Sequence, residues 1–279
     1  AKQEVFLEGP ALNVMDQEVG PDGAIYFVTG GGGAEGGIYR VSWKGQVPRT
    51  VTELGEGISA PIRQPQLHSA WGRQRIAGMV NDVGKAWDKQ LVGVSRSLAN
   101  PPYYRIRALQ LMQLFGPPPS TELLVHLSRD PSEAVRAKAA ELMGLSPDED
   151  SQQRLVELLE DLNGQVRRRA CEALARGGQS VPFEKLVPCL TSEDRFEAWA
   201  ARRLLERLPV ETWREKVLSS DQHRLFIQGG LALLTAHGDQ QHARAVAKRF
   251  SKLLDDFITD RDFVDMLRLA QVALAKGAL

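Results

Sequence analysis

Several residue patterns that define common classes of site are missing from this sequence. The 279 residues include only two cysteines, Cys171 and Cys189, and these form no CxxC or CxxCH pattern. A disulfide framework, a zinc knuckle and covalently attached haem are therefore not supported, and we interpret the two cysteines as buried free thiols. No apolar run reaches the ~18 residues that a membrane-spanning helix needs, so no membrane insertion is predicted.

The charge balance excludes another class. Lys plus Arg and Asp plus Glu both number 35, which gives a formal net charge of zero. A general nucleic-acid binder needs a basic excess, so no nucleic-acid partner is predicted. Hydrophobic residues make up 43% of the chain, which indicates a globular protein with a substantial core. The opening residues, AKQEVFLEGP, lack a basic head followed by an apolar run, so no secretory signal is predicted.

The N-terminal part, residues 1–45, has the pattern of β-structure. Apolar, β-branched and aromatic residues gather at 5–7, 24–28 and 38–43, and a Gly-Pro-Asp-Gly turn precedes the second group. These groups predict a small antiparallel β-meander, too small to fold alone. Residues 46–63 are rich in glycine and proline and are predicted to form a linker.

An internal repeat dominates residues 64–279. Similar segments begin at Tyr104, Val135, Val166 and Phe196, at spacings of 135 − 104 = 31, 166 − 135 = 31 and 196 − 166 = 30 residues. This period predicts a mainly α fold, an α-α superhelix of about five to six helix pairs. The predicted core includes Leu109, Leu111, Ala139, Leu142, Leu155, Leu158, Ala170, Leu174 and Leu186.

The repeats resemble HEAT repeats of the short, phycobilisome-lyase-like type. Asp130 precedes Arg136 by six residues, and Asp161 precedes Arg167 by six. The resemblance implies that these four residues form a ladder of hydrogen bonds between neighbouring repeats. In the fourth copy Glu197 stands at the arginine position, so the ladder is expected to end there.

The N-terminal part resembles the last blade of a β-propeller. Asp16, the turn at 20–23, Ile25-Tyr26 and residues 36–40 match the repeated strands of propellers related to quinone-dependent glucose or sorbosone dehydrogenases. A blade followed by HEAT repeats is similar to large exported bacterial proteins, well represented in planctomycetes and named membrane-bound dehydrogenases. The resemblance implies an internal segment of a longer periplasmic or exported protein, and it assigns no redox site to these residues.

Two loops were considered as binding sites. The glycine-rich segment 30–37 lacks the Lys-Ser/Thr and the following helix of a phosphate-binding loop, so a hairpin loop is predicted. Asp16, Glu18 and Asp22 lack the alternating oxygen ligands of a calcium loop.

The histidines offer no clearer site. His237 and His242 are five residues apart around Gly238, a spacing typical of an inter-helix loop rather than a metal-binding helix face. We therefore predict no catalytic, cofactor-binding or metal-binding residues, and no cofactor.

The stacked basic residues give the remaining surface signal. Arg105, Arg136 and Arg167 form one column, which the ladder explains. Arg107, Lys138 and Arg169 form a second column, with two interpretations. It is either a solvated face neutralised by Glu141 and Glu172 or part of a groove for an acidic partner.

Three functions remain open from the sequence. The first is a protein-interaction or scaffolding solenoid with a protein or peptide partner and no catalytic site of its own. The second is a non-catalytic segment of an exported quinone- or haem-dependent dehydrogenase. The third, resting on the repeat type alone, is a lyase-type HEAT protein that handles tetrapyrrole-bearing proteins.

Overall fold

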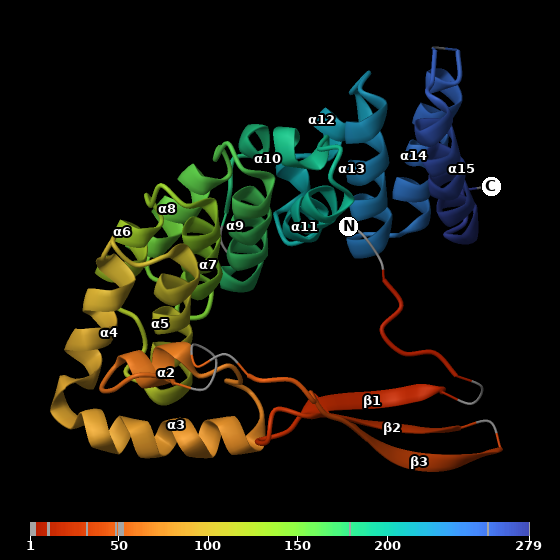
Figure 1. The fold of residues 1–279 in the computed structure, drawn as a ribbon. Coiled ribbons are helices and arrows are strands. Elements are labelled where there is room, and N and C mark those ends of the chain that lie inside the picture. The colour runs from red at the N-terminus through yellow and green to blue at the C-terminus, as the bar shows by residue number, and fades with distance from the viewer. Residues whose placement is uncertain are drawn as a thin grey trace. The chain divides into compact units, whose positions relative to one another are not determined.

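The computed structural model describes residues 4–9, 12–31, 33–47, 49, 53–178, 180–255 and 257–278. Over this part the chain consists of a small antiparallel sheet followed by stacked helices (Figure 1). The predicted fold class is thus confirmed: mainly α, a HEAT-like superhelix with an N-terminal β-meander.

The sheet has the strand order β1-β2-β3, with both pairs antiparallel. Its strands are β1 (Val14–Val19), β2 (Ile25–Gly31) and β3 (Ala34–Val41). The expected first strand at 5–7 was wrong, since these residues form no strand and the Phe6 side chain is 75% exposed. The turn at 20–23 joins neighbouring strands, so the partner of β2 has to end at Val19. Hydropathy did not predict β1 because several of its side chains are polar.

The helices occupy the remainder of the described chain. They are α2 (Ser59–Arg63), α3 (Ala70–Val83), α4 (Trp87–Arg96), α5 (Pro102–Phe115), α6 (Thr121–Leu127), α7 (Glu133–Met143), α8 (Glu149–Leu158), α9 (Gly164–Gly177), α10 (Phe183–Leu190), α11 (Arg195–Leu205), α12 (Arg214–Leu218), α13 (His223–Ala236), α14 (Gln240–Leu253) and α15 (Asp260–Ala275), with 3-10 turns η1 (Gly84–Ala86) and η2 (Val210–Thr212). The end of the predicted linker 46–63 is therefore helical, and its positions 48 and 50–52 lie outside the described residues.

Two compact units emerge from the contacts. The first comprises the described residues up to Val94 together with Gln110–Pro117, and the second comprises Ser95–Leu109 and the described residues from Pro118 onward. The predicted boundary at residue 64 therefore differs from this division. Within the first unit, Trp71 Nε1 of α3 donates to the Val19 carbonyl at 3.0 Å, which attaches this helix to the sheet.

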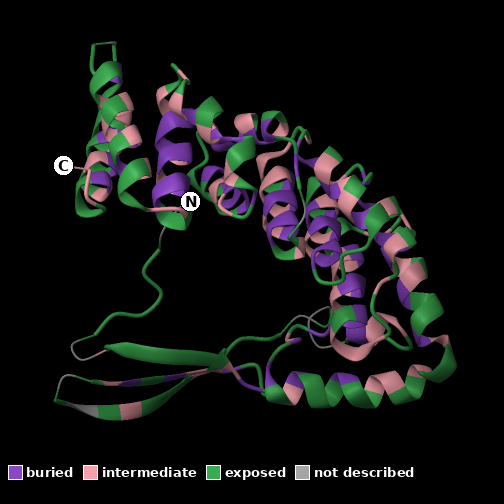
Figure 2. Ribbon diagram, turned by 180° about the vertical axis from the view of Figure 1, so that it is seen from behind, coloured by how far each residue is buried: buried purple, intermediate pink, exposed green. Residues whose placement is uncertain are grey.

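The second unit is a curved double row of helices. In Figure 1, α6, α8 and α10 form the outer row, and α7, α9 and α11 form the inner row. Successive inner helices are in contact, and their small residues Ala139, Ala170 and Ala200 are fully buried. The whole predicted core is buried, and Figure 2 shows buried residues running along the repeat helices. The stacking register read from the 31-residue period is therefore confirmed.

Candidate functional site: an arginine ladder and a basic groove

Arg136 connects two neighbouring repeats. Its Nε and Nη2 donate to the two carboxylate oxygens of Asp161 at 2.8 and 2.9 Å. Its Nη1 donates to the main-chain carbonyl of Asp130, in its own repeat, at 2.9 Å. A bidentate, charge-assisted pair of this kind is both directional and stronger than a neutral hydrogen bond.

The same contact recurs on either side. Arg105 pairs with Asp130, and both side chains are almost fully buried. Arg167 donates to both oxygens of Glu197 at 2.6 and 2.9 Å. Glu197 stands at the arginine position of its own repeat and cannot donate onward, so within the described residues the ladder ends there, as expected. Glu197 has a buried carboxylate long enough to accept the arginine of the preceding repeat, so it replaces the aspartate as the acceptor.

The ladder aspartates also support the helices that follow them. Asp130 accepts from the backbone N–H of Ser132, and Asp161 accepts from that of Asn163, the residues that immediately precede α7 and α9. Burial alone would raise the pKa of Asp161, but hydrogen bonds from Arg136 and the Asn163 backbone outweigh it, so that pKa is lowered. The ionised carboxylate is therefore the form that the fold stabilises.

The second basic column is largely neutralised. Lys138 pairs with Glu141 at 2.7 Å, and Arg169 pairs with Glu172 at 2.8 Å. Arg107 is half-buried, and burial lowers its pKa. These contacts fit the interpretation of a paired helix surface better than that of an acidic-partner column made by Arg107, Lys138 and Arg169.

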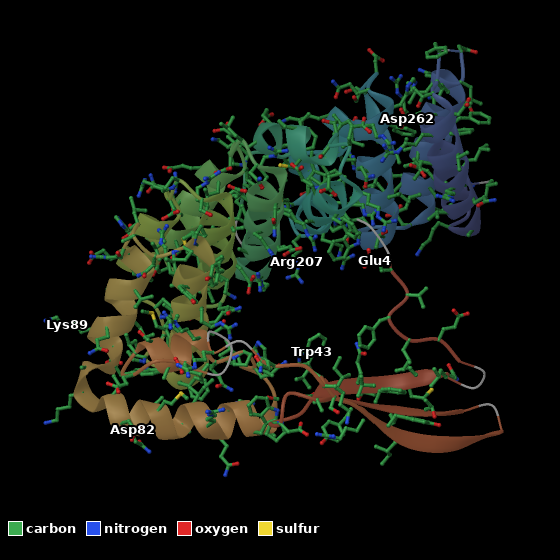
Figure 3. The ribbon with its side chains drawn as sticks, in the orientation of Figure 1. Glu4, Trp43, Asp82, Lys89, Arg207 and Asp262 are labelled. Carbon is green, nitrogen blue, oxygen red and sulfur yellow. The ribbon has the colours of Figure 1, made fainter. Side chains whose placement is uncertain are left out.

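A groove of about 580 Å³ lies next to that column, mainly between α9 and α11. It is lined by Glu141, Arg168, Arg169, Glu172, Ala175, Arg176, Trp199, Ala200, Arg203 and Arg207. Trp199 is 48% exposed within it. Figure 3 labels Arg207 on the inner side of the inner helix row. The groove therefore combines several cations with one large aromatic surface.

Sequence analysis missed this groove because the second basic column was followed only as far as Arg169. The fourth copy begins 196 − 166 = 30 residues after the third, so its Trp199 takes the position of Arg169, since 199 − 169 = 30. Extending the column by one repeat would therefore have placed an aromatic side chain next to Arg169. Arg176 and Arg207 do not share a repeat position, so their place in one groove follows from the structure alone.

A larger open cavity of about 1060 Å³ lies over α6 and α8. Two of its arginines form ion pairs, Arg96 with Glu122 at 3.0 Å and Arg154 with Glu157 at 2.6 Å. This cavity offers less uncompensated charge than the groove between α9 and α11.

Asp22, in the turn between β1 and β2, holds neighbouring strands of the sheet together. Asp22 accepts from Arg40 at 2.7 Å, from Tyr26 Oη and from the Ala24 backbone. The hydrogen bond from Arg40, followed by that from Ala24, lowers the pKa of Asp22 to about 2. The glycine-rich segment 30–37 forms a hairpin as predicted, but most of it is strand rather than loop. Gly30 and Gly31 end β2, residues 34–37 begin β3, and position 32 between them lies outside the described residues.

The remaining candidates also have structural roles. Asp239 caps α14 by accepting from the His242 backbone at 2.8 Å, so this segment is an inter-helix loop as predicted. Cys171 and Cys189 are buried free thiols, and their mutual hydrogen bond, followed by burial, raises the pKa of Cys171. Across the described ranges, no group of three or more His, Cys, Asp or Glu side chains is arranged to hold a metal ion.

Comparison with known proteins assigns the repeat class. HEAT repeats match residues 96–175 and 120–206, which include the ladder and the residues that line the groove except Arg207. These residues are HEAT repeats. A search of curated proteins gave no match. The crystal structure of an engineered protein is 18% identical, covering 83% of this chain and 98% of that chain, with a TM-score of 0.33, too low to add to the fold assignment.

Within the described residues, no helix is both long and apolar enough to cross a membrane.

Proposed function

We propose that the repeat unit is a protein-interaction solenoid that holds a protein or peptide partner against its inner helix row. The observation that carries the proposal is the half-exposed Trp199, set among arginines in the groove between α9 and α11. Tryptophan and arginine are the residues most enriched at the energetic centres of protein interfaces. HEAT repeats commonly mediate protein interactions, which supports the same function.

We further propose that this chain does not catalyse a reaction itself. The charged side chains around the ladder are occupied in pairing repeats or capping helices. We therefore assign the chain a binding or scaffolding role without a catalytic site or bound cofactor of its own.

The test is affinity capture from an extract of the source cells with purified chain. We expect Trp199→Ala to lose at least one partner that the unmodified chain recovers. Phe257→Ala is the matched control, because Phe257 is an aromatic residue 90% exposed outside the groove. Identical recovery with all three chains would contradict a role for the groove.

A second candidate is that the chain is the non-catalytic segment of an exported quinone- or haem-dependent dehydrogenase. Its support is the blade-like hairpin sequence together with apolar side chains on the sheet, such as Met15 and Ile38, exposed at 63% and 80%. This candidate predicts propeller blades encoded before residue 1 and a CxxCH motif after residue 279. Determining the full reading frame tests it, and a frame with neither feature would remove it.

A further inference from the structure

We propose that the groove between α9 and α11 binds a linear acidic peptide segment, with an apolar side chain of that segment seated on Trp199. This inference rests on the proposed interaction function and names the chemistry of the partner. It follows from the charge balance of the groove, from the order of its residues along the helices and from the position of its glutamates.

The groove has more cations than its own carboxylates can pair. Arg168 and Arg169 both pair with Glu172 at 2.8 Å, and Arg203 pairs with Glu206. Arg176 and Arg207 are exposed, and within the described part of the chain neither forms an ion pair. Two guanidinium groups therefore remain available for the carboxylates of a ligand.

The aromatic and cationic ends of the groove are separate. At one end the Arg168 guanidinium lies over the Phe196 ring, 5.2 Å from its centroid, and Phe196 and Trp199 are each 48% exposed. At the other end are Arg176 and Arg207. Arg168 and Arg176 are both in α9, eight residues and so ~12 Å apart along the helix.

This separation sets the spacing in the ligand. An extended peptide advances ~3.3 Å per residue, so ~12 Å corresponds to about four residues. The ligand should therefore carry an apolar side chain followed or preceded, about four residues away, by two or more acidic side chains. The aromatic residue supplies apolar contact area, and the carboxylates fix the position of the segment.

Glutamates in the groove favour a peptide over a nucleic acid. Glu141 and Glu172 line the wall between the cations. A continuous phosphate backbone carries a charge at every nucleotide and would meet these carboxylates. A peptide can place uncharged residues opposite them, so the arrangement selects discontinuous negative charge.

The test is fluorescence anisotropy with a labelled twelve-residue peptide in which one Phe lies four residues from three consecutive Glu, in a Gly-Ser background. We expect saturable binding that weakens with added salt, because exposed charges are screened. Replacing the glutamates by lysines should abolish binding, and replacing Phe by Ser should weaken it. No binding of the acidic peptide at millimolar concentration, or equal binding of the lysine peptide, would overturn the inference.

Variants locate the binding. Arg176→Ala with Arg207→Ala should weaken the acidic peptide about tenfold or more, since two charge-assisted contacts are lost. The matched control is Arg244→Ala with Lys248→Ala, two exposed cations of α14, which should change affinity less than about twofold. Circular dichroism checks that both double variants are folded. If a double variant is unfolded, the single variant Arg207→Gln, together with the salt dependence of binding by the unmodified chain, tests the role of the Arg207 charge.

Two other outcomes are decisive. Tighter binding of a single-stranded oligonucleotide, lost in the Arg176/Arg207 variant, would replace the peptide assignment with a nucleic-acid one. If the acidic peptide fails but Trp199→Ala still loses a captured partner, the acidic chemistry is wrong and the interaction function stands.

Discussion

Arg136 links two repeats through one planar group, because its guanidinium reaches the Asp161 carboxylate and the Asp130 carbonyl at the same time. The sequence identified Arg136 and Asp161 from their spacing, but not which aspartate the arginine would reach. That choice depends on the angle between stacked repeats, which no local pattern encodes. For the same reason the sequence placed the end of the ladder at Glu197 but did not show that the Glu197 carboxylate accepts from Arg167.

Removing Arg136 should cost more than removing a neighbouring paired cation. We expect Arg136→Ala to lower the free energy of unfolding by about 1.5–3 kcal/mol, the range for hydrogen bonds to charged groups. Lys138→Ala, which breaks an i,i+3 helix pair, should cost about 0.5 kcal/mol or less. Chemical denaturation measures both, and equal effects on the midpoint would show that the ladder contributes nothing special.

The ladder also gives stability a defined pH dependence. The folded-state pKa of Asp161 is lowered, so its contribution is present above its unfolded pKa and is lost as the pH falls through the folded value. With an unfolded aspartate pKa of about 3.9, the loss should begin below about pH 4. The difference in unfolding free energy between the unmodified chain and Asp161→Asn should therefore shrink from pH 7 to pH 3. A constant difference would mean that the Asp161 carboxylate is not stabilised by folding.

At the scale of secondary-structure elements, the sequence predicted the repeat helices better than the strands. The second helix of each repeat, such as α7, α9 and α11, was predictable because each repeat buries the same apolar face at an interval of about 31 residues. β1 was not, because Asp16, Gln17 and Glu18 break its alternation. The attachment of α3 to the sheet was not predictable either, because helical periodicity cannot reveal the hydrogen bond from Trp71 Nε1 to the Val19 carbonyl.

Close packing between α12 and α13 makes Gly229 a sensitive position. A Cβ at Gly229 would lie 2.4 Å from Val217 Cγ2, so the helices would have to separate. Gly229→Ala should therefore destabilise the second unit by about 1–3 kcal/mol, as overpacking does. Gly177→Ala is the control, because its added Cβ would meet Pro147 Cβ at an ordinary 3.5 Å. Thermal denaturation should show the control unchanged or stabilised by up to about 1 kcal/mol, and a tolerated Gly229→Ala would refute the close contact.

At the scale of the whole molecule, the repeat period predicted the fold class, and the matched HEAT repeats cover residues 96–206. The solenoid follows from helix pairs that cannot bury their apolar faces alone and so stack on their neighbours. Function is less accessible from sequence, because the ladder residues are common to stacked repeats. The groove depends on residues such as Trp199 of α11 and Arg176 of α9, which come together only through the stacking of neighbouring repeats.

Site-specific photo-crosslinking tests most directly whether the inner helix row is the binding surface. A photoreactive amino acid would be placed at Phe196 or Arg203 at the groove, which leaves Trp199, Arg176 and Arg207 in place, and at Glu149 of α8 or Glu184 of α10 in the outer row, all exposed positions. We expect crosslinks to a partner from source-cell extract at the two groove positions and none at the two outer positions. Crosslinks only from the outer row, or the same yield from all four positions, would contradict binding through the groove.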